Sequence, residues 1–106
     1  MNSKLKKLSE IVAKANDSFT RKFDHLDTLM GIMDKILRAQ GMKADAVTID
    51  CIALDKKIVF LIHDNKPDIV GVAQGNKDGD IYSSLEYKVS DLSESTIVRI
   101  IETYFI

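Results

Sequence analysis

The sequence predicts an α+β fold, with helical segments at the N-terminus, a four-stranded antiparallel β-meander and a C-terminal helix packed on the sheet. Three observations predict it. Apolar residues recur at helical spacing as far as residue 40, alternate with polar residues over 46–89, and return to helical spacing over 93–105. The chain has 106 residues, of which 45% are hydrophobic, so a single domain over 1–106 with an aliphatic core is expected.

The first segment, residues 1–17, is predicted to be a basic helical arm. Leu5, Leu8 and Val12 are spaced by three and four residues, so they lie on one face of a helix. Residues 16–18 (Asn-Asp-Ser) are weak helix formers, and each is a good N-cap. They predict that the helix breaks here, although the apolar spacing also fits one uninterrupted helix.

Residues 18–40 are predicted to form a long amphipathic helix that ends before Gly41. Its apolar stripe consists of Phe19, Phe23, Leu26, Met30, Met33 and Leu37. A single helix through this segment and the arm would be about 57 Å long, which exceeds the size of a domain of this length. The overhanging stripe therefore predicts cover either by the same chain, through a fold-back of residues 1–18, or by a second subunit.

The alternating region 46–89 is predicted to hold four strands. They are 47–53, 58–62, 69–74 and 81–89. The connections between them are short, and the Asp-Gly pair at 78–79 is typical of a hairpin turn. Parallel strands would need longer crossover connections, so the strands are expected to pair antiparallel in the order 1-2-3-4.

The last helix is predicted over 93–105, with Ser93 as its N-cap. Leu92 and Ile97 occupy the two positions of a hydrophobic staple. The apolar residues near the end of the chain are expected to dock on the same chain or on a partner. The predicted core consists of Phe23, Leu26, Met30, Met33, Leu37, Val47, Ile49, Cys51, Ile58, Phe60, Ile62, Val70, Val72, Leu85, Tyr87, Ile97, Ile101 and Tyr104.

Charge is divided unevenly along the chain. Residues 1–43 carry nine Lys and Arg against five Asp and Glu, a net charge of +4, whereas residues 44–106 carry six against eleven, a net charge of −5. The basic patch of the arm consists of Lys4, Lys7, Lys14 and Arg21. Such a patch suits phosphate binding, so a nucleic-acid-associated protein is one alternative function. The patch carries no interleaved aromatic residue that could stack on bases, which favours a solubilising or self-complementary role.

No residue pattern reaches the specificity of a catalytic motif, and no catalytic residue, metal site or cofactor is predicted. His63 and Asp64 lie at the end of a predicted strand, with Asp68 nearby, and would suit a general base with an orienting carboxylate. Cys51 is the nearest candidate nucleophile, but its apolar strand phase favours a place in the core. A small-ligand binder or an enzyme at the loop 63–68 is therefore the other alternative function.

The sequence favours a small, cytoplasmic, non-enzymatic interaction or regulatory protein that acts through self-association and its helical arm. One cysteine excludes an internal disulfide, which fits a reducing compartment, and the longest apolar run is too short to cross a membrane. A homodimer is the expected assembly because two-fold interfaces are the commonest; a further protein partner is also compatible with the sequence. The residues expected to form the interaction surface are Leu5, Leu8, Val12, Phe19, Tyr104 and Phe105.

Overall fold

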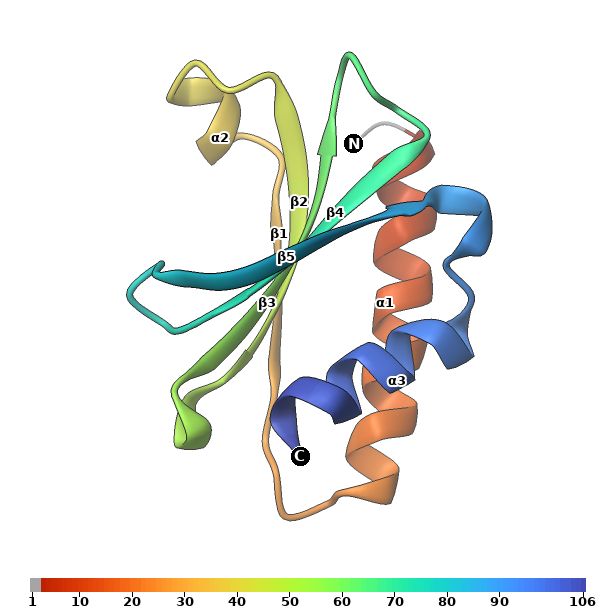
Figure 1. The fold of residues 1–106 in the computed structure, drawn as a ribbon, viewed down its shortest axis with the longest axis vertical. Helices are drawn as coiled ribbons and strands as arrows, with labels where there is room; N and C mark the ends of the chain where they lie inside the picture. Colours follow the sequence, from red (N-terminus) through yellow and green to blue (C-terminus); the bar gives the residue numbers. More distant parts are fainter. Residues whose placement is uncertain (1–2) are drawn as a thin grey trace.

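The computed structural model describes residues 3–106 as one antiparallel sheet with two long helices (Figure 1). In chain order the elements are α1 (Ser3–Lys22), β1 (Leu29–Met33), α2 (Ile36–Ala39), β2 (Ala44–Cys51), the 3-10 turn η1 (Ile52–Leu54), β3 (Lys56–His63), β4 (Ile69–Gly75), β5 (Ile81–Lys88), the 3-10 turn η2 (Val89–Asp91) and α3 (Glu94–Phe105). The α+β class, the antiparallel sheet and the packed C-terminal helix are confirmed. The sheet has five strands rather than the four predicted.

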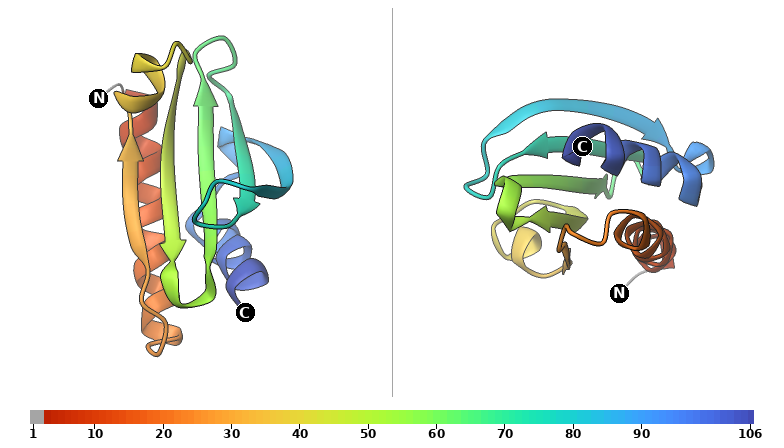
Figure 2. Two further views of the ribbon diagram at one scale, coloured as in Figure 1. Left: turned by 90° about the vertical axis from the view of Figure 1, so that its left-hand side faces the viewer. Right: turned by 90° about the horizontal axis from the view of Figure 1, so that it is seen from below.

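The strands follow one another in the order β1-β2-β3-β4-β5, each antiparallel to its neighbour. This is the meander that short connections favour. Both long helices lie on one face of the sheet, and α1 packs against β2 and against α3 (Figure 2). The opposite face has no helix across its centre, and only the short α2 sits at one end of it. The sheet therefore has a covered face and an open face.

The predicted helix break at residues 16–18 is wrong, because α1 continues through this segment to Lys22. Ala15 and Phe19 are both fully buried, so the apolar stripe stays in register across it. The amide oxygen of Asn16 accepts a hydrogen bond at 2.7 Å from the hydroxyl of Thr28, which lies in the connection between α1 and β1, so this polar side chain has a partner while the residue stays helical. Packing of the stripe against the chain's own sheet outweighs the weak helix propensity of the segment.

The predicted helix over 18–40 is also wrong, because most of it after Lys22 is not helical. Met30 lies opposite Ile49 in the β1–β2 pair, and its side chain packs against the core. Gly31 lies opposite Thr48 on the other face, where an added Cβ would come within 3.0 Å of the threonine hydroxyl oxygen. The apolar pattern of the five residues of β1 is compatible with either a strand or a helix. Pairing with β2 favours the strand.

The core lies between the covered face and the two long helices. It is formed by Leu5, Leu8, Val12, Ala15, Phe19, Val47, Ile49, Cys51, Ile58, Phe60, Ile62, Val70, Val72, Leu92, Ile97, Ile100, Ile101 and Phe105. Each large apolar side chain fully buried there contributes roughly 1.5–3 kcal/mol. Most of the predicted core is confirmed, but Leu85 is 66% exposed, and Met33 and Leu37 are only half-buried outside this cluster.

The start of α3 follows the sequence expectation. The hydroxyl of Ser93 accepts a hydrogen bond from the backbone N–H of Thr96 at 3.2 Å, which is the N-cap interaction. Leu92 and Ile97 are both buried, as a hydrophobic staple requires. The far end of the helix is held by Phe105, whose ring meets that of Phe19 edge-on at 5.9 Å. The helix is thus fixed at both ends on its own chain.

The β4–β5 connection is the predicted hairpin turn, organised by one buried side chain. The amide oxygen of Asn76 accepts hydrogen bonds from the backbone N–H groups of Asp78 and Asp80, and its amide nitrogen donates to the Asp80 carboxylate and the Tyr82 hydroxyl. Gly79 supplies a backbone φ of +94°, which L-residues rarely adopt. These contacts fix where β5 begins.

Candidate interaction surface

The residues predicted to form the interaction surface are mostly in the chain's own core. Leu5, Leu8, Val12, Phe19 and Phe105 are all buried in the cluster between the helices and the sheet. The hydroxyl of Tyr104, which is half-buried, donates to the backbone carbonyl of Gly75 at 2.6 Å. The apolar stripe of α1 therefore covers its own sheet, and in this structure these side chains do not offer a surface to a partner.

The four residues of the predicted basic patch do not act as one group. Lys4 is paired with the carboxylate of Asp68 at 2.9 Å. Lys7, Lys14 and Arg21 are exposed along the outer side of α1. Glu10 and Asp17, also exposed, alternate with them at steps of three and four residues. The outer side of α1 consequently carries alternating charges rather than a continuous basic strip.

The loop 63–68 is engaged in structural contacts. The guanidinium of Arg38 in α2 donates to both carboxylate oxygens of Asp64, each at 2.8 Å, and to both oxygens of the largely buried Asp45, at 2.9 and 3.0 Å. This guanidinium holds the pKa of Asp64 below its usual value, mainly through the hydrogen bonds. The same two carboxylates raise the pKa of Arg38 further above its ordinary range. The group clamps α2 to the ends of β2 and β3.

The groups considered for acid–base chemistry are not assembled. His63 is exposed and lies opposite Ala44, at one end of the β2–β3 pair. Cys51 is fully buried and lies opposite Lys56, at the other end. A hollow of about 260 Å³ beside His63 is lined by Ser3, Lys4, Asp45, Ile62, His63, Asp64 and Pro67. Cys51 and His63 therefore lie at opposite ends of the β2–β3 pair and do not form a Cys–His pair.

The described part of the chain offers neither a metal-binding cluster nor a membrane-spanning helix. Residues 3–106 contain no cluster of three or more His, Cys, Asp or Glu side chains placed to hold a metal ion. Among these residues, His25 is exposed, and its ring lies edge-on to that of Phe23 at 6.4 Å. Within the same range, none of the helices is long and apolar enough to cross a bilayer.

Both edge strands expose large apolar side chains: Leu29 and Ile32 on β1, and a group of three on β5. Ile81, Tyr82 and Leu85 are 53%, 66% and 66% exposed. This strand is the last in the sheet order, so it has β4 on one side and no partner strand among the described residues on the other. Unpaired edges with exposed apolar side chains are the usual place where a sheet accepts a strand from another chain.

The free edge of β5 has a defined set of backbone groups. Val89, just after the strand, donates its N–H to the carbonyl of Asp68 at 2.8 Å, so the backbone of Val89 faces β4. Backbone groups alternate sides along a strand. Ser84, Glu86 and Lys88 therefore direct their N–H and C=O groups to the unpaired side.

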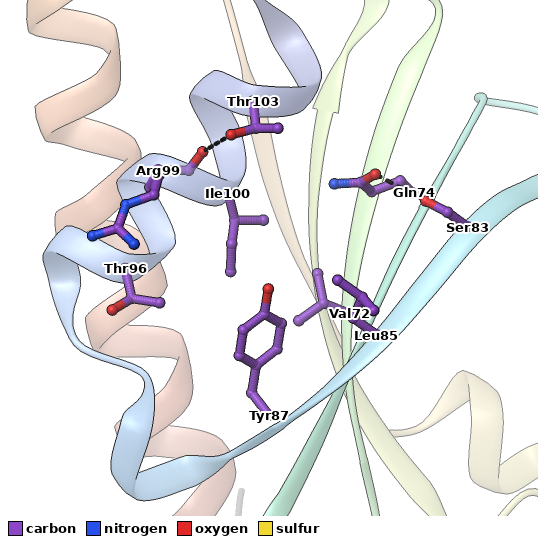
Figure 3. A pocket seen from close by; sticks show the side chains of 9 residues that line it. All are labelled: Val72, Gln74, Ser83, Leu85, Tyr87, Thr96, Arg99, Ile100 and Thr103. Carbon is purple, nitrogen blue, oxygen red and sulfur yellow. Dashed lines mark hydrogen bonds between the residues drawn. The ribbon is translucent and has the colours of Figure 1, made fainter.

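An apolar groove runs between β5 and α3 on the covered face, where Tyr87 packs against the core but Leu85 stays exposed. The groove has a volume of about 270 Å³ and is lined by Val72, Gln74, Ser83, Leu85, Tyr87, Thr96, Arg99, Ile100 and Thr103. In Figure 3 the ring of Tyr87 points from β5 toward Ile100, with Val72 and Leu85 beside it. Polar side chains, including Arg99, form the rim.

A second hollow lies on the open face, over β3, β4 and β5. It has a volume of about 540 Å³, and its floor includes Val59, Leu61, Gly71 and Ala73. Ser84 and Glu86 of β5 lie at its side. The free edge of β5 is thus flanked by a partly apolar depression on each face of the sheet.

The comparisons with known proteins add no relative: no family model, no curated protein and no solved structure matches the chain. The sequence did not single out β5 as a site. One signal was available, because the last strand of any meander is an edge strand. The position of α3, which leaves that edge uncovered, has no counterpart in the sequence pattern.

Proposed function

We propose that this chain is a non-enzymatic interaction protein that binds another polypeptide along the free edge of β5. The observation that supports it is the exposure of Ile81, Tyr82 and Leu85 on an unpaired strand. A strand added there would gain backbone hydrogen bonds from Ser84, Glu86 and Lys88. Its side chains would enter the depressions on the two faces of the sheet.

Burial of the exposed apolar side chains of β5 would favour binding of a partner. Large apolar side chains contribute roughly 1.5–3 kcal/mol each when they are transferred from water to a fully buried position. Monomeric proteins usually protect an edge strand with a proline, a bulge or a covering helix. Here the only proline, Pro67, lies between β3 and β4, the register shift of the β4–β5 pair is confined to Gln74 and Gly75, and Leu85 stays exposed beside α3.

A reducing, cytoplasmic location is part of the same proposal. The only cysteine, Cys51, is a free thiol buried in the core. A single buried thiol is common in proteins that fold without disulfides.

The nucleic-acid alternative has less support. Lys7, Lys14 and Arg21 are exposed but alternate with Glu10 and Asp17, which weakens the field that a phosphate backbone would meet. The expected result is that the purified protein does not shift single- or double-stranded nucleic acid in a gel at low salt.

The proposed function can be tested by site-directed photo-cross-linking in cells that express the protein. A photoreactive phenylalanine derivative in place of Leu85 is expected to give a specific protein adduct. The matched control places the same residue at Lys14, which is exposed on α1 and should give none. Equal labelling from both positions, or no adduct from position 85, would contradict the proposal.

A further inference from the structure

We infer that the polypeptide that pairs with β5 is a second copy of this chain, arranged antiparallel about a two-fold axis that passes beside Leu85. The inference rests on the proposed function and names its partner. The two five-stranded sheets would join edge to edge into one continuous sheet. The helices of both copies would remain on the same face.

The symmetry of such a pair limits the possible registers. In an antiparallel pair, residues directly opposite each other point to the same face. A two-fold axis perpendicular to a continuous sheet therefore places one residue opposite its own copy. Within the part of β5 that is free to pair, that central residue is Ser84, Leu85, Glu86 or Tyr87.

These registers differ in which charges they bring together and in whether the paired residues stay within β5. Centring on Glu86 would set two carboxylates opposite each other, which is destabilising. Centring on Tyr87 would carry the pairing into η2, where the strand has ended. Centring on Ser84 would place Leu85 opposite Ser83 of the other copy, so the two exposed leucines would not meet. The register centred on Leu85 pairs residues 82–88 of both copies within β5 and places the two leucines opposite each other.

The Leu85 register also gives each exposed group a suitable partner. The backbone of Leu85 faces β4, so the two Leu85 residues form a non-hydrogen-bonded pair, in which Cα atoms approach to about 4.5 Å. Ser84 lies opposite Glu86 of the second copy, and their outward backbone groups can exchange hydrogen bonds. Lys88 comes beside Tyr82 at each end, where its ammonium can meet an aromatic ring.

The covered face gains most from this arrangement. The apolar grooves of the two copies would meet across the axis, with the Leu85 side chains at their junction. Leu85 is 66% exposed and Tyr87 is half-buried in the isolated chain. Burial of both on each copy would give the interface an apolar centre, and Arg99 would remain at its polar rim.

The other unpaired edge, β1, is the competing partner for β5. A β5–β1 contact joins two different surfaces and would extend into open chains of molecules, whereas β5–β5 pairing closes at two copies. β1 also exposes Leu29 and Ile32 and could pair with its own copy, but its five residues offer a shorter pair than the eight of β5. These differences favour the symmetric pair.

Disulfide cross-linking of variants with a single cysteine substitution tests both whether the partner is a second copy and which register the two strands adopt. Ser84→Cys, Leu85→Cys and Glu86→Cys all change exposed residues, and each brings its thiol opposite its own copy in only one register. Under mild oxidation, Leu85→Cys is expected to give a disulfide-linked dimer of twice 11.9 kDa and to react faster than the other two. The unmodified chain is the control, since its only thiol, Cys51, is buried.

Light scattering provides the second measurement. The unmodified protein is expected to have a dimeric mass at high micromolar concentration, and Leu85→Lys is expected to halve that mass while leaving the circular dichroism spectrum unchanged. A monomeric mass at every concentration, or faster cross-linking at position 84 or 86, would overturn the Leu85-centred dimer. A series of higher oligomers would indicate β5–β1 contact and would also overturn it.

The two proposals can fail separately. If the photoreactive group at position 85 labels a different protein while the purified chain is monomeric, the β5 edge remains the interaction surface and self-pairing is wrong. If position 85 labels nothing and the chain is monomeric, both proposals are wrong.

Discussion

Val72 and Leu85 lie directly opposite each other in β4 and β5, yet Val72 is 4% exposed and Leu85 is 66% exposed. Both belong to the covered face of the sheet. The difference arises because the helices shield β4 fully but cover only part of the last strand, where Tyr87 packs against the core and Leu85 does not. This pair therefore marks the line at which the core ends and the candidate interaction surface begins.

The same pair gives the first prediction. Val72→Ala is expected to lower the free energy of unfolding by about 2 kcal/mol, because it leaves a cavity in the core. Leu85→Ala is expected to change it by less than about 0.5 kcal/mol, as for other exposed positions. Urea denaturation at low protein concentration, where self-association does not contribute, would measure both. Equal losses from the two substitutions would show that Leu85 is buried in the monomer.

The second prediction concerns the Arg38–Asp64 contact at low pH. The pKa of Asp64 is lower in the folded chain than its usual value, so this carboxylate stabilises the fold above the usual carboxyl pKa and loses its effect as the pH falls through and below that range. Asp64→Asn is expected to reduce stability at pH 7 and to make the melting temperature fall less between pH 7 and pH 3. Asp91→Asn, at an exposed position in η2, is the control. An unchanged slope in Asp64→Asn would contradict the clamp.

The third prediction concerns the N-terminal segment. Removal of residues 1–16 would take Leu5, Leu8 and Val12 out of the core. The truncated chain is therefore expected to lose its cooperative thermal transition, as followed by circular dichroism. The matched control, Lys7→Gln together with Lys14→Gln, changes only the outer side of α1 and should melt like the unmodified protein. A truncated chain that still unfolds cooperatively would show that the arm is separable from the fold.

The fourth prediction compares two glycines of β4. A Cβ at Gly75 would overlap the backbone carbonyl of Asp80, where the β4–β5 register shifts. Gly75→Ala is expected to lower the free energy of unfolding by about 1–3 kcal/mol through overpacking. A Cβ at Gly71 would meet its nearest atom, the carbonyl oxygen of Leu61, at 3.9 Å, which is ordinary contact. Thermal melts in which Gly71→Ala is as damaging as Gly75→Ala would contradict this account.

The elements predicted with most success are those with a strong local signal. The cap at Ser93, the staple formed by Leu92 and Ile97, and the Asp-Gly turn at 78–79 depend on neighbouring residues only. The segment 29–33 was misassigned because its apolar residues fit a continued helical stripe. Its partner, β2, begins at Ala44, so only the paired sheet distinguishes the two structures.

The candidate interaction surface depends on the packing of distant elements. Leu85 was assigned to the core because alternation along β5 places it on the covered face, and this assignment of the face is correct. Its exposure follows from where α3 lies, and α3 is positioned by its contacts with α1 at the other end of the chain. The local alternation therefore predicts which face of the sheet carries Leu85, but it does not predict whether a helix covers that residue.

Local sequence patterns are sufficient to predict the α+β class, the antiparallel meander and the apolar stripe of α1, because periodicity and short turns depend on residues close together in the chain. Three features depend on long-range packing: the stripe of α1 covers its own sheet, residues 29–33 form a fifth strand, and the outer edge of β5 stays unpaired among the described residues. They depend on which apolar surfaces pack against each other, and those packing contacts form between residues that are far apart in the sequence.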